Sequence, residues 1–186
     1  GRDIILIGHK GHPEVIGTLG RHPKNTDTKI FLVETKKDIE NLVINEKNIA
    51  FVTQTTLSVD ETKEIIDELK HKFPAIIGPS ADDICYATQN RQDAVKQLSL
   101  ECQIVLVIGS QTSSNSNRLK ELAEKCGTKS FLIDDKTDID LNSLRDATSV
   151  GITAGASAPE EIVQEVISFL VPLGFKTVRN LSLIHI

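Results

Sequence analysis

Short apolar runs alternate with segments of helical periodicity along most of this chain. Apolar runs of strand length lie at 4–7, 30–33, 49–53, 75–77, 104–108, 130–133 and 149–153. Apolar residues at helical spacing occur near 13–20, over 59–72, in the stretch that begins at 80, around 119–123, and from 158 onward. Continuous apolar runs separated by helical segments are typical of parallel sheets whose strands are buried on both faces. The pattern therefore predicts an α/β fold made of βαβ units.

The pattern of apolar and polar positions repeats once, with an offset of 100 residues almost throughout. The run 4–7 corresponds to 104–107, and the segment 28–34 corresponds to 128–134. An internal repeat of this kind indicates two related structural units, because each copy carries its own apolar face and needs its own core. We therefore expect two half-length α/β units, each with a parallel sheet.

Composition and charge narrow the class of protein. The chain is 39% hydrophobic and 25% charged, but it has only six Phe, one Tyr and no Trp, so its core must consist mainly of Ile, Leu, Val and Ala. The net charge of −5, without a basic stripe, argues against binding to nucleic acid or to an anionic membrane. No apolar run approaches the roughly 20 residues needed to span a bilayer. These observations predict neither a nucleic-acid nor a membrane partner.

Four polar loops follow predicted strands, at 8–14, 53–58, 109–117 and 153–159. In an open parallel sheet, ligands bind beyond the carboxyl ends of the strands, where exposed N–H groups at helix N-termini favour anions. Ser, Thr and Asn also serve as ordinary helix caps, which is the better explanation for any one loop alone. Four such loops at equivalent ends of a repeat favour a site for one small anion, although none matches a known phosphate-binding fingerprint.

Two residues of the first loop, His12 and Glu14, are candidates for proton chemistry. A histidine can donate a hydrogen bond to an anion and changes charge near neutral pH, and a glutamate can deliver a proton. The spacing alone gives equal weight to a surface histidine and a capping glutamate. His9 presents the same choice more weakly.

The three cysteines are widely spaced and form no paired motif, which favours free thiols or metal ligands in a reducing compartment. Cys85 lies at the predicted start of the helix between the units, where a helix N-terminus favours the thiolate. It is therefore a candidate ligand or nucleophile, although a lone cysteine is more often a small buried hydrophobe. We expect Cys102 and Cys126 to be only small buried hydrophobic residues.

Taken together, the polar loops resemble those of the LytB family, the 4-hydroxy-3-methylbut-2-enyl diphosphate reductases of isoprenoid synthesis. The matching stretches are 5–15, 53–60, 82–88, 113–119 and 151–159, and the likeness runs from residue 3 to about 174. This resemblance implies that residues 1–80 are the middle domain and residues 81–174 the last domain of a three-domain α/β fold.

The resemblance also implies an activity, which is the reductive dehydroxylation of an allylic alcohol diphosphate to isopentenyl and dimethylallyl diphosphate by a [4Fe-4S] enzyme. Cys85 matches one of three cysteine ligands of the cluster, Glu14 matches the proton-delivering acid, and Thr55 matches the hydroxyl that orients the substrate alcohol. The diphosphate-binding positions of the family fall on His12, Ser113, Ser114, Asn115 and Ser157. The family further implies a cytoplasmic location and a one-electron donor such as flavodoxin or ferredoxin.

Several departures from the family qualify this expectation. The other two cluster cysteines belong to a preceding domain, and neither Cys102 nor Cys126 matches a ligand motif. The likeness decays beyond Gly174, and the last residues, 181–186, read like a translated sequencing adaptor following a divergent tail over 175–186. We therefore expect a fragment with little catalytic activity of its own. The competing hypothesis is a two-lobed binding module for a phosphorylated metabolite, without redox chemistry.

Overall fold

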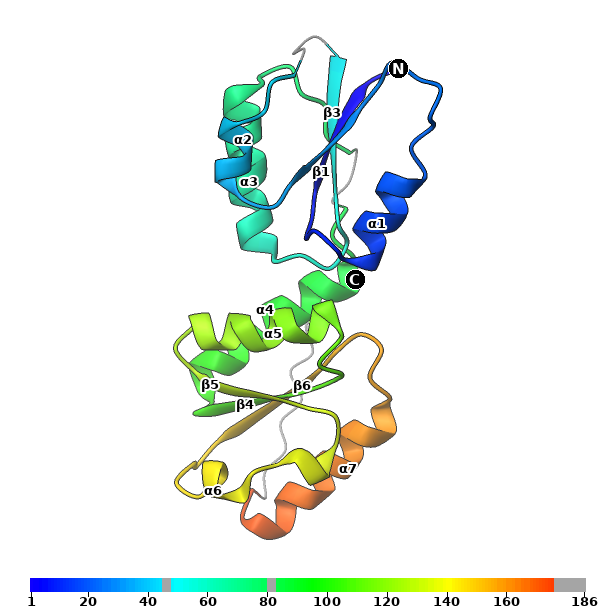
Figure 1. Ribbon diagram of the computed structural model, residues 1–186. Helices are drawn as coiled ribbons and strands as arrows, with labels where there is room; N and C mark the ends of the chain where they lie inside the picture. The colour runs from blue at the N-terminus through cyan, green and yellow to red at the C-terminus, as the bar shows by residue number, and fades with distance from the viewer. Residues whose placement is uncertain (45–47, 80–82, 176–186) are drawn as a thin grey trace. The chain divides into compact units, whose positions relative to one another are not determined.

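Two three-stranded parallel sheets, one in each half of the chain, form the framework of the computed structural model (Figure 1). The structure describes residues 1–44, 48–79 and 83–175. The chain divides into two compact units, Gly1–Cys85 and Tyr86–Ile186. The domain boundary predicted at 80/81 and most of the predicted tail lie outside the described residues.

Unit 1 contains the strands β1 (Asp3–Ile7), β2 (Ile30–Val33) and β3 (Ile49–Thr53) in the order β2-β1-β3. Its helices are α1 (Pro13–Gly20), α2 (Lys36–Glu40) and α3 (Val59–Lys72). One core cluster, which includes Ile5, Ile7, Phe51, Ile65 and Leu69, joins the sheet to α3. The α1 helix lies apart from α2 and α3, as Figure 1 shows.

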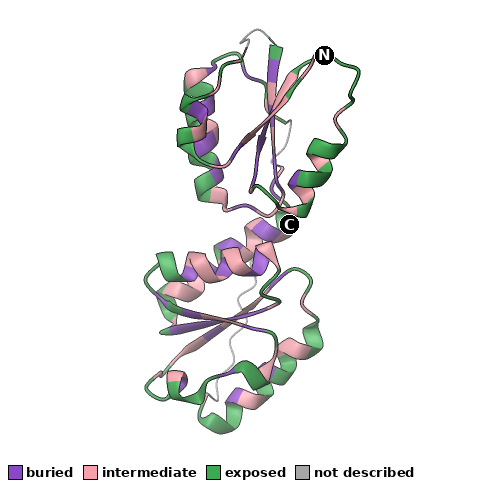
Figure 2. Cartoon of the chain, in the orientation of Figure 1, coloured by how far each residue is buried: buried purple, intermediate pink, exposed green. Residues whose placement is uncertain are grey.

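Unit 2 contains the strands β4 (Ile104–Ile108), β5 (Lys129–Ile133) and β6 (Val150–Ala154) in the order β5-β4-β6. Its helical segments are α4 (Tyr86–Glu101), α5 (Ser114–Lys125), η2 (Lys136–Asp138), α6 (Leu141–Leu144), α7 (Glu160–Leu170) and η3 (Val171–Leu173). All five residues of β4 are buried (Figure 2), because α4 and α5 pack on one face of the sheet and α6 and α7 on the other. A strand covered on both faces accounts for the continuous apolar run in the sequence.

Strand register confirms the predicted repeat and fold class. In unit 1, Ile4 pairs with Ile30 and Ala50. In unit 2, Val105 pairs with Ser130 and Gly151 in the same way. Both units are therefore parallel α/β sheets with the same strand order. Among the described residues, no helix is long and apolar enough to cross a membrane.

The strand predicted at 75–77 is wrong, since this segment forms only a single bridge between Ala50 and Ile77. Pro74 and Pro79 flank the three apolar residues, and proline cannot donate to a strand ladder. A β-carbon at Gly78 would lie 2.5 Å from the Phe51 ring, so the chain passes close against the core instead of continuing along the sheet.

The short helix α2 was not predicted, and hydrogen bonds to one carboxylate explain its start. Oδ2 of Asp38 accepts bonds from the N–H groups of Glu34 and Thr35 at 3.0 and 2.8 Å, and from the Thr35 hydroxyl at 3.0 Å. These bonds hold the pKa of Asp38 below its ordinary value, chiefly through the Thr35 N–H.

Replacing Asp38 by Ala is expected to lower the free energy of unfolding near neutral pH by about 1 kcal/mol, because a capping acceptor is lost. A carboxyl whose pKa is lower in the folded state stabilises above its unfolded pKa, and this contribution disappears as pH falls through the folded pKa. The difference between the proteins should therefore shrink below about pH 4. Urea unfolding at several pH values measures it, with Asp67→Ala as a surface-acid control. A difference that does not change with pH would contradict the capping role.

Candidate functional site

In unit 1, the polar loop after β1 leads directly into α1, and His12 caps that helix. Nδ1 of His12 accepts the N–H of Glu14 at 3.3 Å, and the His12 backbone is extended, as usual for a cap. Because Nδ1 acts as the acceptor, the proton of a neutral ring must lie on Nε2. The cap thus leaves Nε2–H as the group that can bind a ligand.

Glu14, in the first turn of α1, is held by Thr55 from the loop after β3. The Thr55 N–H lies 3.0 and 3.2 Å from the two carboxylate oxygens, and the Thr55 hydroxyl donates to Oε2 at 3.1 Å. Both residues are half-buried. The structure therefore brings together an acid and a hydroxyl that lie 41 residues apart in the sequence.

A cavity of about 220 Å³ adjoins this pair. Its wall combines apolar and polar groups, from Leu6, Glu14, Val15, Thr18, Val52, Thr53, Gln54, Thr55 and Asp83. This volume exceeds that of a few water molecules, so a small organic group fits beside the carboxylate.

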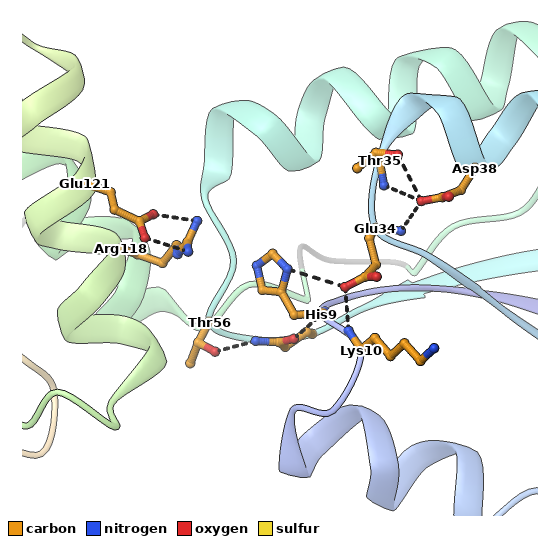
Figure 3. Close-up of polar contacts among 9 residues, drawn as sticks. His9, Lys10, Glu34, Thr35, Asp38, Thr56, Arg118 and Glu121 are labelled. Atoms are coloured by element: carbon orange, nitrogen blue, oxygen red, sulfur yellow. Dashed lines mark hydrogen bonds and ion pairs between the residues drawn. The ribbon is translucent and has the colours of Figure 1, made fainter.

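Gln54, which the sequence analysis did not single out, organises the loop around this cavity. Its side chain is 1% exposed, accepts the His9 N–H at 3.0 Å and donates to the Thr56 hydroxyl at 3.0 Å. Glu34 holds the same loop from the other side, since it accepts the Lys10 N–H at 2.6 Å and lies 3.9 Å from Nδ1 of His9 (Figure 3). The loop after β1 is therefore fixed by side chains at the ends of β2 and β3, the two strands that flank β1.

Cys85 is exposed and directly precedes α4, so it is not the small buried residue that a lone cysteine most often is. Its N–H donates to the Thr55 carbonyl at 3.0 Å. Cys85, Thr55 and Glu14 thus belong to one connected group in unit 1. The prediction that Cys126 is a small buried residue is wrong, because it is the exposed C-cap of α5 and lies outside the core. Cys102 is half-buried near Gly151.

In unit 2, Ser113 caps α5 at the position that His12 occupies in unit 1. Its Oγ accepts the N–H of Ser116 at 3.3 Å and the Ser116 hydroxyl at 3.0 Å. With its oxygen used as an acceptor, the Ser113 hydroxyl proton remains able to bind an anion. Ser114, in the next position, begins the helix.

Ser116 is 1% exposed because it fills a slot between two glycines. A β-carbon at Gly109 or at Gly155 would lie 2.2 or 2.3 Å from its Oγ. These glycines follow β4 and β6, so both strand-end loops pass close to the N-terminus of α5. Ser157 lies exposed in the turn after Gly155.

The Asn115 side chain is buried without a hydrogen-bond partner. It is 5% exposed, and neither its amide nitrogen nor its amide oxygen is bonded to any described residue. An unsatisfied buried polar group costs about 1–3 kcal/mol. Asn115 lies in the first turn of α5, beside Ser113 and Ser114, so the N-terminus of this helix carries an unpaired buried amide.

A metal site is not completed by the part of the chain that the structure describes. No three His, Cys, Asp or Glu side chains there are placed to hold a metal ion together. Cys85 stands among these residues as a single exposed thiol directly before α4.

The fold and these groups define an α/β protein with polar, helix-capping loops at the strand ends and an acid in one of its units. The family model described as LytB protein matches residues 1–171. The chain therefore belongs to the LytB family, and the resemblance inferred from its motifs is confirmed.

Two relatives carry the name 4-hydroxy-3-methylbut-2-enyl diphosphate reductase. The protein of Alcanivorax borkumensis is 58% identical over 175 residues, covering 94% of this chain and 56% of that protein. The protein of Chromohalobacter salexigens is 57% identical over 183 residues, covering 98% and 58%. The chain thus spans little more than half the length of these relatives.

Solved structures agree with this assignment. The E-1-hydroxy-2-methyl-but-2-enyl-4-diphosphate reductase of Plasmodium falciparum has a TM-score of 0.86 at 35% identity, over 94% of this chain and 54% of that one. A second structure, described as (E)-4-hydroxy-3-methyl-but-2-enyl diphosphate reductase, the terminal enzyme of the non-mevalonate pathway, has a TM-score of 0.52 at 32% identity, over 92% and 60%.

Replacing Asn115 by Leu is expected to raise the free energy of unfolding by about 1 kcal/mol, because an unpaired buried amide is exchanged for an apolar group of similar size. Asn117 is the matched control, since its amide donates to the carbonyls of Gln111 and Ser113 at 2.7 and 2.9 Å. Asn117→Leu should therefore lower stability. Denaturant unfolding of both variants checks this, and a loss of stability in Asn115→Leu would show that the amide is satisfied in the free protein.

Proposed function

We propose that this chain is part of a 4-hydroxy-3-methylbut-2-enyl diphosphate reductase, which removes the hydroxyl group of an allylic alcohol diphosphate by reduction. The products are isopentenyl and dimethylallyl diphosphate, and the reaction consumes two electrons and two protons and releases water. The observation that carries this proposal is the bonded pair of Glu14 and Thr55 beside a small cavity. The names of the closely similar relatives support it.

The diphosphate is assigned to neutral donors. In unit 2, these are the hydroxyls of Ser113, Ser114 and Ser157 and the unpaired Asn115 amide, next to the N-terminus of α5. In unit 1, Nε2–H of His12 is the corresponding donor. Hydrogen bonds to anions at a helix N-terminus are favourable without a full positive charge, which fits the composition of these loops.

Glu14 is proposed to deliver a proton by way of Thr55. The Thr55 hydroxyl donates to Oε2 of Glu14, so its oxygen can accept a bond from the substrate alcohol. To protonate the departing hydroxyl group, these two bonds must reverse. A protonated Glu14 donates to the Thr55 oxygen, and the Thr55 hydroxyl proton passes to the departing oxygen, which leaves as water. Such general acid catalysis typically contributes 10²–10⁴-fold in rate.

The reductant is proposed to be a [4Fe-4S] cluster, which supplies the two electrons when it is bound. The exposed thiol of Cys85 suits one cluster ligand. The described residues offer no complete ligand set, so this chain alone does not fit the whole cluster and is expected to be inactive. The full-length protein would take its electrons from a donor such as flavodoxin or ferredoxin in the cytoplasm.

Glu14→Gln in the full-length protein should lower turnover by at least about 100-fold and leave substrate affinity within a few-fold, because the amide keeps the Thr55 contact but carries no transferable proton. Anaerobic steady-state kinetics and substrate titration measure the two quantities. Equal turnover in the variant and the parent would reject Glu14 as the acid.

Cys85→Ser distinguishes the reductase from a binding module that lacks redox chemistry. In the reductase, this change should abolish stable cluster binding and turnover, whereas Cys126→Ser, at another exposed cysteine, should preserve both. Iron content and visible absorbance after anaerobic reconstitution give the readout. Full function of the Cys85→Ser protein would favour the binding module.

A further inference from the structure

The segment at the end of β3 connects two separate functional groups. The Thr55 N–H and hydroxyl both bind the Glu14 carboxylate, as described above. The carbonyl of the same residue accepts the Cys85 N–H at 3.0 Å. A single residue therefore connects the proposed acid with the proposed cluster ligand, and a movement of Thr55 changes the placement of both.

Asp83 makes a second connection between the cysteine segment and this strand end. Its Oδ2 accepts the Thr53 N–H at 2.8 Å. The outer edge of β3 explains why this N–H needs a partner. The Phe51 N–H on that edge binds the Ile77 carbonyl at 2.9 Å, whereas the Gln54 N–H points the other way, to Ile7. The next outward N–H belongs to Thr53, and the Asp83 carboxylate takes the place that a strand carbonyl would hold.

We propose that Asp83 is a positioning residue that fixes Cys85 relative to Glu14, an inference that rests on the proposed function. Two bonds, Thr53 to Asp83 and Cys85 to Thr55, run in opposite directions between the same two segments, as in a short piece of sheet ladder. Ile84, between Asp83 and Cys85, is buried in the core of unit 1, so the segment is anchored there and the two bonds fix the direction of its backbone on either side. With both bonds in place, the distance between thiol and acid is set by the end of β3. Asp83 acts through this backbone and not by contact with the reacting atoms.

Amide hydrogen exchange on the present chain tests the connection without any cofactor. In Asp83→Ala, the amides of Thr53 and Cys85 should exchange at least about tenfold faster, while the Phe51 amide keeps its rate. Asp83→Asn should largely restore slow exchange, because its amide oxygen can still accept the bond. Asp67→Ala serves as the control for loss of an acid in the same unit.

Wild-type exchange rates at Thr53 and Cys85 in Asp83→Ala would overturn the proposal. If Asp83→Ala does not fold, the Phe51 amide also exchanges fast, and Asp83→Asn then decides. Slow exchange at Thr53 and Cys85 in that variant supports the hydrogen-bond role, and fast exchange confined to those two amides refutes it.

In the full-length holoprotein, kcat and the lifetime of the cluster distinguish a positioning role from a purely structural one, because loss of structure alone would not change them selectively. Asp83→Ala should lower kcat several-fold, leave KM within about twofold, and hasten loss of the cluster absorbance in air, whereas Asp83→Asn should resemble the parent. A changed KM with unchanged kcat and cluster lifetime would contradict a positioning role. Absence of a cluster in the parent protein would defeat the proposed function instead, and the exchange experiment would still decide whether Asp83 holds the cysteine segment.

Discussion

Backbone hydrogen bonding around the central strand of each sheet determines where all the other parts can lie. The N–H that follows the central strand binds the second strand, from Gly8 to Val33 in unit 1 and from Gly109 to Ile133 in unit 2, at 3.0 and 2.9 Å. The residue after the third strand binds back to the central strand at 2.8 Å in both units. Buried backbone groups must be paired, and these bonds hold the carboxyl ends of the three strands together, so the loops leave the sheet at the same end. The candidate groups lie at that end of the sheet.

The two units present different side chains at the carboxyl ends of their strands, and a few residue exchanges account for the difference. In unit 1, the position after the third strand is Gln54, whose side chain fills the space beside Gly8. In unit 2, the corresponding residue is Gly155, and Ser116 from α5 occupies the vacant space. Next to these positions, the first helical turn carries Glu14 in one unit and Asn115 in the other. One framework thus presents a carboxylate in unit 1 and an amide in unit 2.

The strands and long helices could be predicted because buried positions require apolar residues at the period of each element, as the fully apolar run of β4 illustrates. The polar loops were recognisable for a similar reason, since caps and turns require Ser, Thr, Asn and Gly. The choice between cap and ligand at His12 could not be made from spacing, and the structure shows that one ring nitrogen caps while the other stays available. The hydrogen bonds of Asp83 and Gln54 could not be predicted from the sequence, because their partners lie 30 and 45 residues away.

The charge of the candidate anion site is the feature in which unit 2 differs most from ordinary phosphate sites. The loops 109–117 and 153–159 contain no Lys or Arg. The first cation of α5, Arg118, is paired through both terminal nitrogens with Glu121, at 2.7 and 2.9 Å (Figure 3). Arg91 of α4 reaches the end of β6, where its Nε donates to the Ala154 carbonyl at 2.9 Å. The other groups that these loops offer to an anion are neutral N–H and O–H donors and the unpaired amide of Asn115. Such donors select an anion by shape and lone-pair direction, whereas a cluster of cations would attract any anion through charge. The buried amide without a partner destabilises the free protein, and a ligand that pairs it would recover that free energy on binding.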